Sequence, residues 1–215
     1  DLKWDFNPTP TELISLTAFY KLIKNPISRI EVASAGGYLS YENIADKATV
    51  AGVEVEVRKN LFVRPLSSAA NGMNKLSFGL NGSYIYTNAK MPLATVTTGS
   101  QLEGAAPWIA NFDLSHNFTK GNHSFINTLV LNYVSDKIYT IGTQGYQDIM
   151  EQGMMTLDFV SQAKLNKYVS LTLKARNLLN PSYKLSRKAN ESGEKVVLSD
   201  YKKGINISLG VSCTF

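Results

Sequence analysis

The sequence of 215 residues contains one cysteine, Cys213, so no internal disulfide framework exists. It also has no run of about 18 apolar residues, the length that a membrane-spanning helix needs. Charged residues make up 18% of the chain and hydrophobic residues 44%, a balance that argues against a disordered protein. A β-strand that spans a bilayer needs apolar side chains only at alternate positions, so these absences leave a membrane β-barrel open.

Catalytic signals are also scarce. The two histidines, His116 and His123, flank a short predicted turn, and His116 falls on an apolar register. There is no GxSxG or HExxH motif, and one cysteine with two separated histidines cannot form a metal-ligand cluster. We therefore expect no enzyme, no metal and no cofactor. The net charge is +5, but Lys and Arg are spread along the chain without a nucleic-acid motif, so no nucleic-acid partner is expected.

What the sequence does contain is period-two alternation of apolar and polar residues, the pattern of β-strands. The alternation is weaker at Phe19, which falls on the polar side, and around Ile126 and Val130, where both faces are apolar. The pattern predicts about nine strands, the first incomplete: 2–6, 14–20, 51–58, 76–86, 110–118, 125–134, 155–165, 169–176 and 205–215.

The predicted connections alternate in length. Short turns at one end of the strands and long loops at the other are typical of outer-membrane barrels. Strands of about 10–12 residues, tilted near 45°, cover an apolar band of about 25 Å. The short connections are 7–10, 119–122 and 166–167, the long ones are 24–48, 89–107, 140–152 and 179–202, and an intermediate one, 62–74, occupies a short-turn position.

Periodicity alone does not separate a membrane barrel from a soluble β-sandwich or lipocalin-like barrel. Three features favour the membrane: charged residues on the polar register, which suit a wet or plugged lumen, aromatic residues near strand ends, and a last strand that stops at Phe215. The charged residues are Glu54, Glu56, Arg58, Asp113, Asp158, Lys164, Lys174 and Arg176. The aromatic residues are Tyr20, Tyr84, Tyr86, Trp108, Phe118, Tyr133, Tyr139 and Tyr168.

Two segments carry a family resemblance. The last strand resembles the recognition signal that the barrel-assembly machinery reads in outer-membrane proteins, through Ile207, Leu209, Val211, Cys213 and Phe215. Residues 171–183 (LTLKARNLLNPSY) resemble the NLF/NLL…Y block near the end of TonB-dependent receptors. Segments 16–27 and 51–56 resemble internal strands of the same barrels, so the resemblance spans most of the chain.

The resemblance implies an all-β fold, an antiparallel transmembrane β-barrel of 22 strands around a plug. Because about nine strands cannot close it, residues 1–215 are expected to be the C-terminal portion of one β-barrel domain, without the plug and the earlier strands. With Phe215 on the periplasmic side, the long connections are extracellular. The implied function is TonB-dependent uptake of a scarce, large nutrient (a siderophore, haem, cobalamin or an oligosaccharide) across the outer membrane of a Gram-negative bacterium.

The implied partners are the TonB complex through the missing plug, the barrel-assembly machinery, outer-membrane lipid and lipopolysaccharide, and a surface lipoprotein. Glu54, Glu56 and Arg58 are expected to face the lumen and to contact the plug or water. Two alternatives stay open. One is a complete small barrel of eight or ten strands that acts as a passive pore or an adhesin. The other is a soluble ligand-binding β-barrel.

Two long loops are candidate ligand sites. The first is rich in aromatic and amide groups that suit stacking and hydrogen bonding, although an ordinary loop would look the same; its candidates are Tyr139, Gln144, Tyr146, Gln147 and Asp148. The final loop has an excess of basic residues that would attract an anionic chelate or lipopolysaccharide phosphates, or would form a solvated face. Its charged residues are Lys184, Arg187, Lys188, Lys195, Lys202, Lys203, Glu191, Glu194 and Asp200.

Overall fold

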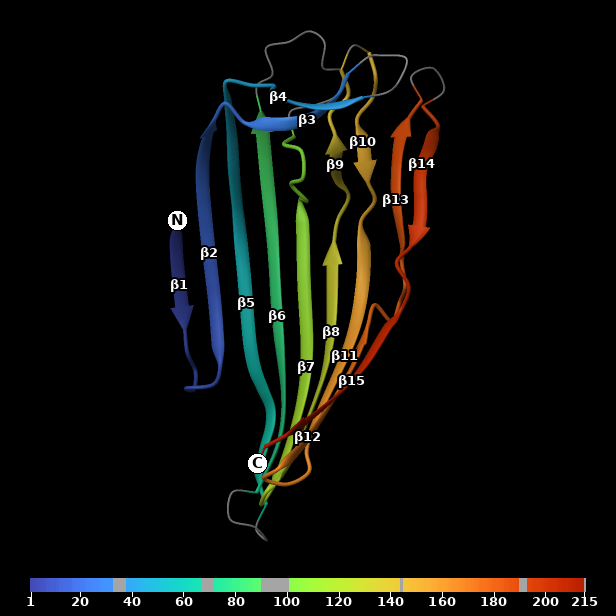
Figure 1. Ribbon diagram of the computed structural model, residues 1–215. Helices are drawn as coiled ribbons and strands as arrows, with labels where there is room; N and C mark the ends of the chain where they lie inside the picture. The colour runs from blue at the N-terminus through green and yellow to red at the C-terminus, as the bar shows by residue number, and fades with distance from the viewer. Residues whose placement is uncertain (33–37, 67–71, 90–100, 144, 190–192, 215) are drawn as a thin grey trace.

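The computed structural model describes residues 1–32, 38–66, 72–89, 101–143, 145–189 and 193–214. Within these ranges, nine strands form one antiparallel sheet, here called the wall (Figure 1). Among the same residues, no helix combines the length and apolar character needed to cross a membrane. In spatial order the wall consists of β1 (Leu2–Phe6), β2 (Leu13–Lys24), β5 (Lys47–Pro65), β6 (Met73–Ala89), β7 (Trp108–Lys120), β8 (His123–Val134), β11 (Met154–Lys164), β12 (Val169–Arg176) and β15 (Asn206–Cys213).

The nine predicted strands are the nine strands of the wall, but one predicted connection was wrong. Residues 62–74 were expected to be an intermediate loop, whereas β5 continues to Pro65 and β6 begins at Met73. A β-bulge between Asn60 and Phe62 adds one residue and shifts the alternation of β5 by one position. The residues of β5 after the bulge therefore do not continue the alternation from which strand 51–58 was predicted.

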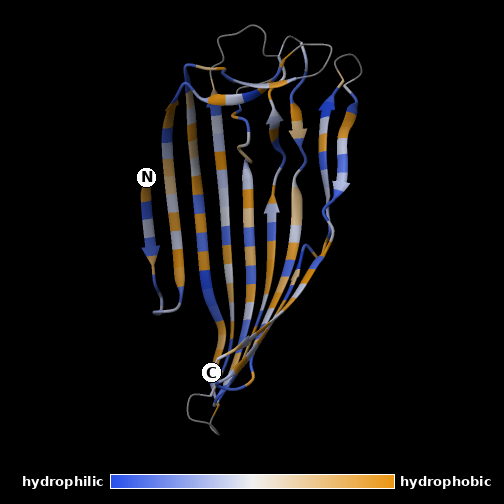
Figure 2. Cartoon of the chain, viewed as in Figure 1, coloured by the Kyte–Doolittle hydropathy of each residue, from blue (hydrophilic) through white to orange (hydrophobic). Residues whose placement is uncertain are grey.

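Cross-strand pairing places most apolar residues of the nine strands on one side of the wall, with Phe19 and Val130 among the exceptions. Residues directly opposite each other in a ladder point to the same side, so each row across the sheet belongs to one face. Figure 2 shows the underlying alternation of hydrophilic and hydrophobic residues along the wall strands. One row of the apolar face is Ile14, Val57, Leu80, Phe112, Leu131 and Leu157. The adjacent row of the polar face is Ser15, Glu56, Asn81, Asn111, Asn132 and Thr156.

The four short connections lie at one end of the wall, the turn end, and the four long ones at the other, the loop end (Figure 1). The predicted alternation of connection lengths is therefore confirmed. At the turn end, β7 and β8 are joined by two residues, Gly121 and Asn122. Gly121 has φ 59°, a conformation that two-residue hairpins require and that glycine adopts without strain.

The long connections were expected to be loops, yet they contain further strands. These strands form an end layer at the loop end, in which β3 pairs with β4 and the order β14-β13-β10-β9 makes a second sheet. Each is only three to eight residues long, and the longest of them, β14 (KVVLSDYK), does not alternate between apolar and polar residues, so period two did not reveal it. In the described residues the end layer consists of β3 (Ile27–Glu31), β4 (Leu39–Asn43), β9 (Lys137–Thr140), β10 (Ile149–Glu151), β13 (Ser182–Lys188) and β14 (Lys195–Lys202).

The buried core lies at the loop end. Ile30 of β3 packs there with Ile44, Ile138 and Ile141, and Met150 packs against them. A second apolar cluster lies at the loop end of β5 and β6 and consists of Ala45, Ala48 and Ala89, with Leu102 packed against them. The parallel bridge between Ile30 and Ile141 joins β3 to the segment that follows β9. The hairpin β3–β4 is therefore held across the end of the wall by a conventional apolar core.

The segment between β12 and β13 explains one motif of the sequence. Asn177 and Asn180 both have positive φ, 58° and 45°, which asparagine tolerates better than most residues. Asn177 Nδ2 donates to the carbonyl of Gly204 at 2.7 Å, and Gly204 N donates to Asn180 Oδ1 at 3.0 Å. The two asparagines thus tie this bend to the neighbouring bend between β14 and β15. They lie within the NLL…Y block.

Candidate functional site

The charged residues predicted to share one face do so. Glu54, Glu56 and Arg58 lie on the polar face of β5, and Arg58 Nε is 2.7 Å from Glu56 Oε1. Strand pairing places the others on the same face: Asp113, Asp158, Lys164, Lys174 and Arg176. Whether this face lines a lumen stays a prediction, but its chemistry matches that of a wet surface.

Two close approaches shape the polar face. A Cβ added at Gly79 would lie 2.3 Å from Asp113 Oδ1, and one added at Gly52 would lie 2.4 Å from Phe19 Cζ. Glycine at these positions therefore lets the Asp113 carboxylate and the Phe19 ring lie flat on the neighbouring strand. This also accounts for Phe19, the large apolar residue on the polar register. Asp158 is engaged differently, because its Oδ1 accepts the backbone N–H of Asn177 at 2.8 Å.

On the apolar face, aromatic residues lie toward both ends of the wall. Tyr84 and Trp108 are paired near the loop end, with ring centroids 4.5 Å apart, and Phe118 faces Phe125 near the turn end. Tyr20, Tyr86 and Tyr133 lie on the apolar face near the loop end. Tyr139, expected among these strand-end aromatics, instead belongs to β9 of the end layer, because the chain kinks after β8.

His116 lies on the apolar face, as its register predicts. Its Nε2 is 2.9 Å from Asn74 Oδ1 of the neighbouring strand, so the imidazole has a hydrogen-bond partner there. His123 begins β8 next to the two-residue turn. Among the residues that the structure describes, no group of three or more His, Cys, Asp or Glu side chains could hold a metal ion.

In the end layer, the predicted ligand residue Tyr139 is paired with Arg29 of β3. The guanidinium carbon lies 4.4 Å from the Tyr139 ring centroid, and Arg29 Nη1 donates to the Tyr139 carbonyl at 3.4 Å. A hydrogen bond to Tyr41 raises the pKa of Arg29 above its ordinary value. Glu103 Oε1 lies 3.9 Å from Arg29 Nη2. Tyr139 therefore holds the hairpin β3–β4 in place.

A second tyrosine of the end layer is also engaged. Tyr183 of β13 donates its hydroxyl hydrogen to Glu151 Oε2 at 3.3 Å, and Lys137 Nζ lies 3.3 Å from the same carboxyl group. Burial, together with the negative charge of Glu151, raises the pKa of Tyr183 to about 12. This tyrosine stays protonated at physiological pH and acts as a hydrogen-bond donor between β13 and β10.

Arg187 of β13 makes the contact that joins the second sheet to the hairpin β3–β4. It forms an ion pair with Glu31, and both side chains are largely buried. The guanidinium carbon also lies 5.5 Å from the Tyr146 ring centroid, so a second predicted ligand residue contacts an arginine. Tyr146 is thus brought beside β13, although it is not part of the cavity described next.

A cavity of about 190 Å³ opens beside β10 and β13. Gln147 and Asp148, both predicted ligand residues, line it, and Asp148 Oδ1 accepts the backbone N–H of Gly142 at 2.8 Å. Gln144, the remaining predicted ligand residue, lies outside the described residues. The other lining residues are Met150, Ser186, Arg187, Lys188 and Lys195. We call this the β13 cavity.

The β13 cavity combines the two loops that the sequence offered as separate candidates. Residues of the first loop meet those of the final loop because Met150 of β10 pairs with Ser186 of β13. Ser186 was not a candidate, since a serine in a polar loop carries no signal of burial. Its side chain is 1% exposed, which only the packed end layer reveals.

The predicted assembly-signal residues Ile207, Leu209, Val211 and Cys213 lie on the apolar face of β15. Phe215 lies outside the described residues, so the signal itself stays a prediction. The chain matches the family described as "TonB dependent receptor-like, beta-barrel" over residues 1–178. No curated protein and no solved structure was found to match it.

Proposed function

The chain belongs to the TonB-dependent receptor β-barrel family. We propose that its wall is the C-terminal part of the barrel of an outer-membrane transporter. The observation that carries this proposal is the nine-stranded wall, with one continuous apolar face and one polar face. Side chains of the apolar face are widely solvent-exposed, including Leu209 at 71%. An exposed apolar band on a sheet that soluble proteins would cover suits contact with lipid.

The edges of the wall support a larger barrel. Among the described strands, β1 and β15 are the two edges of the sheet and pair with one neighbour each. Open edges are not tolerated in lipid, because their backbone N–H and C=O groups would lack partners. We therefore propose that earlier strands of a longer chain complete the barrel between β15 and β1. A complete barrel of eight or ten strands would pair these edges with each other.

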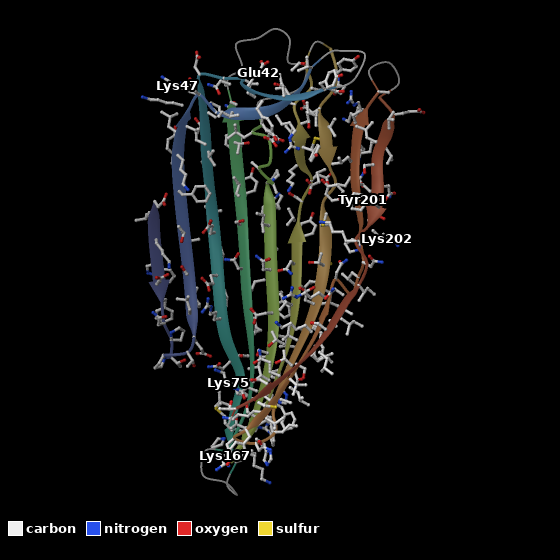
Figure 3. All side chains as sticks on the ribbon, viewed as in Figure 1. Glu42, Lys47, Lys75, Lys167, Tyr201 and Lys202 are labelled. Carbon is white, nitrogen blue, oxygen red and sulfur yellow. The ribbon has the colours of Figure 1, made fainter. Side chains whose placement is uncertain are left out.

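The polar face is then proposed to line the lumen. Receptors of this family act with TonB through a plug inside the barrel, so the charged side chains around Glu54 and Arg58 would contact plug or water. Charged side chains also mark both ends of the wall, with Lys75 and Lys167 at the turn end and Glu42 and Lys47 at the loop end (Figure 3). The transported nutrient is proposed to be a siderophore, haem, cobalamin or an oligosaccharide.

Cysteine labelling of intact cells tests the orientation. In a Cys213→Ser background, Glu194→Cys places a thiol at the loop end and Asn122→Cys places one at the turn end. We expect a membrane-impermeant maleimide to label Glu194→Cys in intact cells, and Asn122→Cys only after the outer membrane is permeabilised. Equal labelling of both, or recovery of the receptor in the soluble fraction, would contradict the proposal.

Uptake assays test the transport. Deletion of the receptor gene should abolish the accumulation of one nutrient of the proposed classes, and deletion of the TonB gene should abolish the accumulation of the same nutrient. A passive pore would keep its uptake without TonB, because diffusion needs no energy coupling. That result would favour the pore over the transporter.

A further inference from the structure

We propose that the β13 cavity is a binding site for an oxyanion, such as the phosphate, sulfate or carboxylate group of a larger ligand. The inference rests on the proposed function only for the side of the membrane on which the cavity lies. Three features of the cavity point to an anion: two lysines placed opposite each other, an unpartnered buried hydroxyl, and an arginine with a free N–H.

The two lysines are the first feature. Lys188 and Lys195 are direct cross-strand partners in the hairpin β13–β14, and both line the cavity. Like charges directly opposite each other destabilise a strand pair. In the described part of the chain, neither lysine has an ion-pair partner. An anion bound between them would convert this repulsion into attraction.

The second feature lies deeper in the cavity. Ser186 is two residues before Lys188 on the same strand, so both side chains point to the same side. Its Oγ is buried and has no hydrogen-bond partner among the described residues. Leaving a buried hydroxyl unpaired is costly, so the cavity lacks an acceptor at this position. An anionic oxygen would be that acceptor.

The third feature is Arg187. Its Nη2 is occupied by the Glu31 carboxylate, while its Nε is buried and lacks a partner in the described residues. The Glu31 contact fixes the guanidinium plane, which leaves a preoriented N–H for one further acceptor. Asp148 is the one carboxylate in the cavity wall, and its Oδ1 is already engaged by the N–H of Gly142 at 2.8 Å.

Size agrees with this chemistry. A cavity of about 190 Å³ holds roughly six water molecules at about 30 Å³ each. That volume accommodates an oxyanion with its nearest substituent, while Met150 and the lysine stems provide an apolar wall for the rest of the group. The ligand is therefore expected to carry its anionic group at the end of a larger body.

Binding of inorganic phosphate to the purified full-length receptor tests the inference, with equilibrium dialysis against radiolabelled phosphate at low ionic strength. We expect saturable binding that K188Q/K195Q weakens at least about tenfold, since charge-assisted hydrogen bonds are lost. S186A should weaken binding by a few-fold. K202Q, which removes a lysine of the same hairpin outside the cavity, should bind like the wild type.

Thermal stability provides a second readout. Because K195Q removes the like-charge pair, it should raise the melting temperature of the receptor in phosphate-free buffer, and added phosphate should then raise it by less than in the wild type. Wild-type receptor should gain stability from phosphate. Absence of phosphate binding by the wild type, or equal binding by wild type and K188Q/K195Q, would overturn the inference.

The source of the anion is resolved by competition. Displacement of phosphate by lipopolysaccharide, but not by its dephosphorylated form, would assign the site to lipid phosphates. Phosphate binding that lipopolysaccharide leaves unchanged would assign it to a soluble ligand. If the labelling and uptake experiments fail while phosphate still binds, only the proposed function is contradicted. If they succeed while phosphate does not bind, only the oxyanion site is contradicted.

Discussion

The wall and the end layer of this chain are stabilised in opposite ways. In the end layer, Ile141 is 1% exposed and packs in an apolar cluster as in a water-soluble protein. In the wall, Val55 and Leu80 are both more than 40% exposed, although they belong to the most regular strands. Regular strands with little burial depend on an external apolar phase, whereas irregular strands at the loop end must supply their own core.

The largest effect should come from the core of the end layer. Ile141→Ala removes a fully buried side chain and should lower the free energy of unfolding of the end layer by about 2–5 kcal/mol. Ile27→Ala, at an exposed position of β3, is the control and should have little effect. Hydrogen exchange of the full receptor in lipid vesicles would show faster exchange in β3, β4, β9 and β10. Equal acceleration in β6 and β7 would mean that the two regions are not separate.

The next effect concerns the wall. Leu129→Arg places a charge at the middle of the apolar face and should destabilise the receptor in vesicles by about 2–4 kcal/mol. Val130→Arg is the matched control, because Val130 is on the polar face directly opposite Asp113 and Asp158. Equilibrium unfolding with guanidinium chloride measures both variants. If Val130→Arg costs as much as Leu129→Arg, the polar face is not in contact with water.

The smallest effect concerns the link between the hairpin β3–β4 and the second sheet. Glu31→Gln removes the carboxylate that pairs with Arg187 in a largely buried position and should cost about 1–3 kcal/mol. Asp200→Asn breaks the more exposed pair with Lys184 and should cost about 0–1 kcal/mol. Thermal unfolding monitored by hydrogen exchange of β3 compares the two. Equal costs would show that the ion pair between Glu31 and Arg187 does not join the hairpin β3–β4 to the second sheet.

Most of the wall was predictable because the side on which a strand residue points is a local property. Leu171, Leu173 and Ala175 alternate with polar residues whatever their neighbours are, so periodicity found β12 correctly. The bulge after Asn60 is an exception, because one extra residue in β5 exchanges the sides to which the following residues point. Prediction therefore failed at the point where the strand itself departs from period two.

The end layer was not predictable for a different reason. Its strands are short, and their residues are buried by contacts with segments distant in sequence, such as Ile30 with Ile141. Tyr139 and Tyr146 looked like ligand residues because they are aromatic and lie in a polar loop. In the structure they contact Arg29 and Arg187, partners that no local pattern indicates.

The sequence by itself determined the two faces of the wall, the places of its nine strands and the family. Alternation and motifs are local patterns, so they can be recognised without knowing which segments pair. Only the tertiary structure decided that Gln147 and Asp148 share a cavity with Ser186, Lys188 and Lys195. The reason is that pairing of β10 with β13 joins two connections, each of which is polar and unremarkable when read alone.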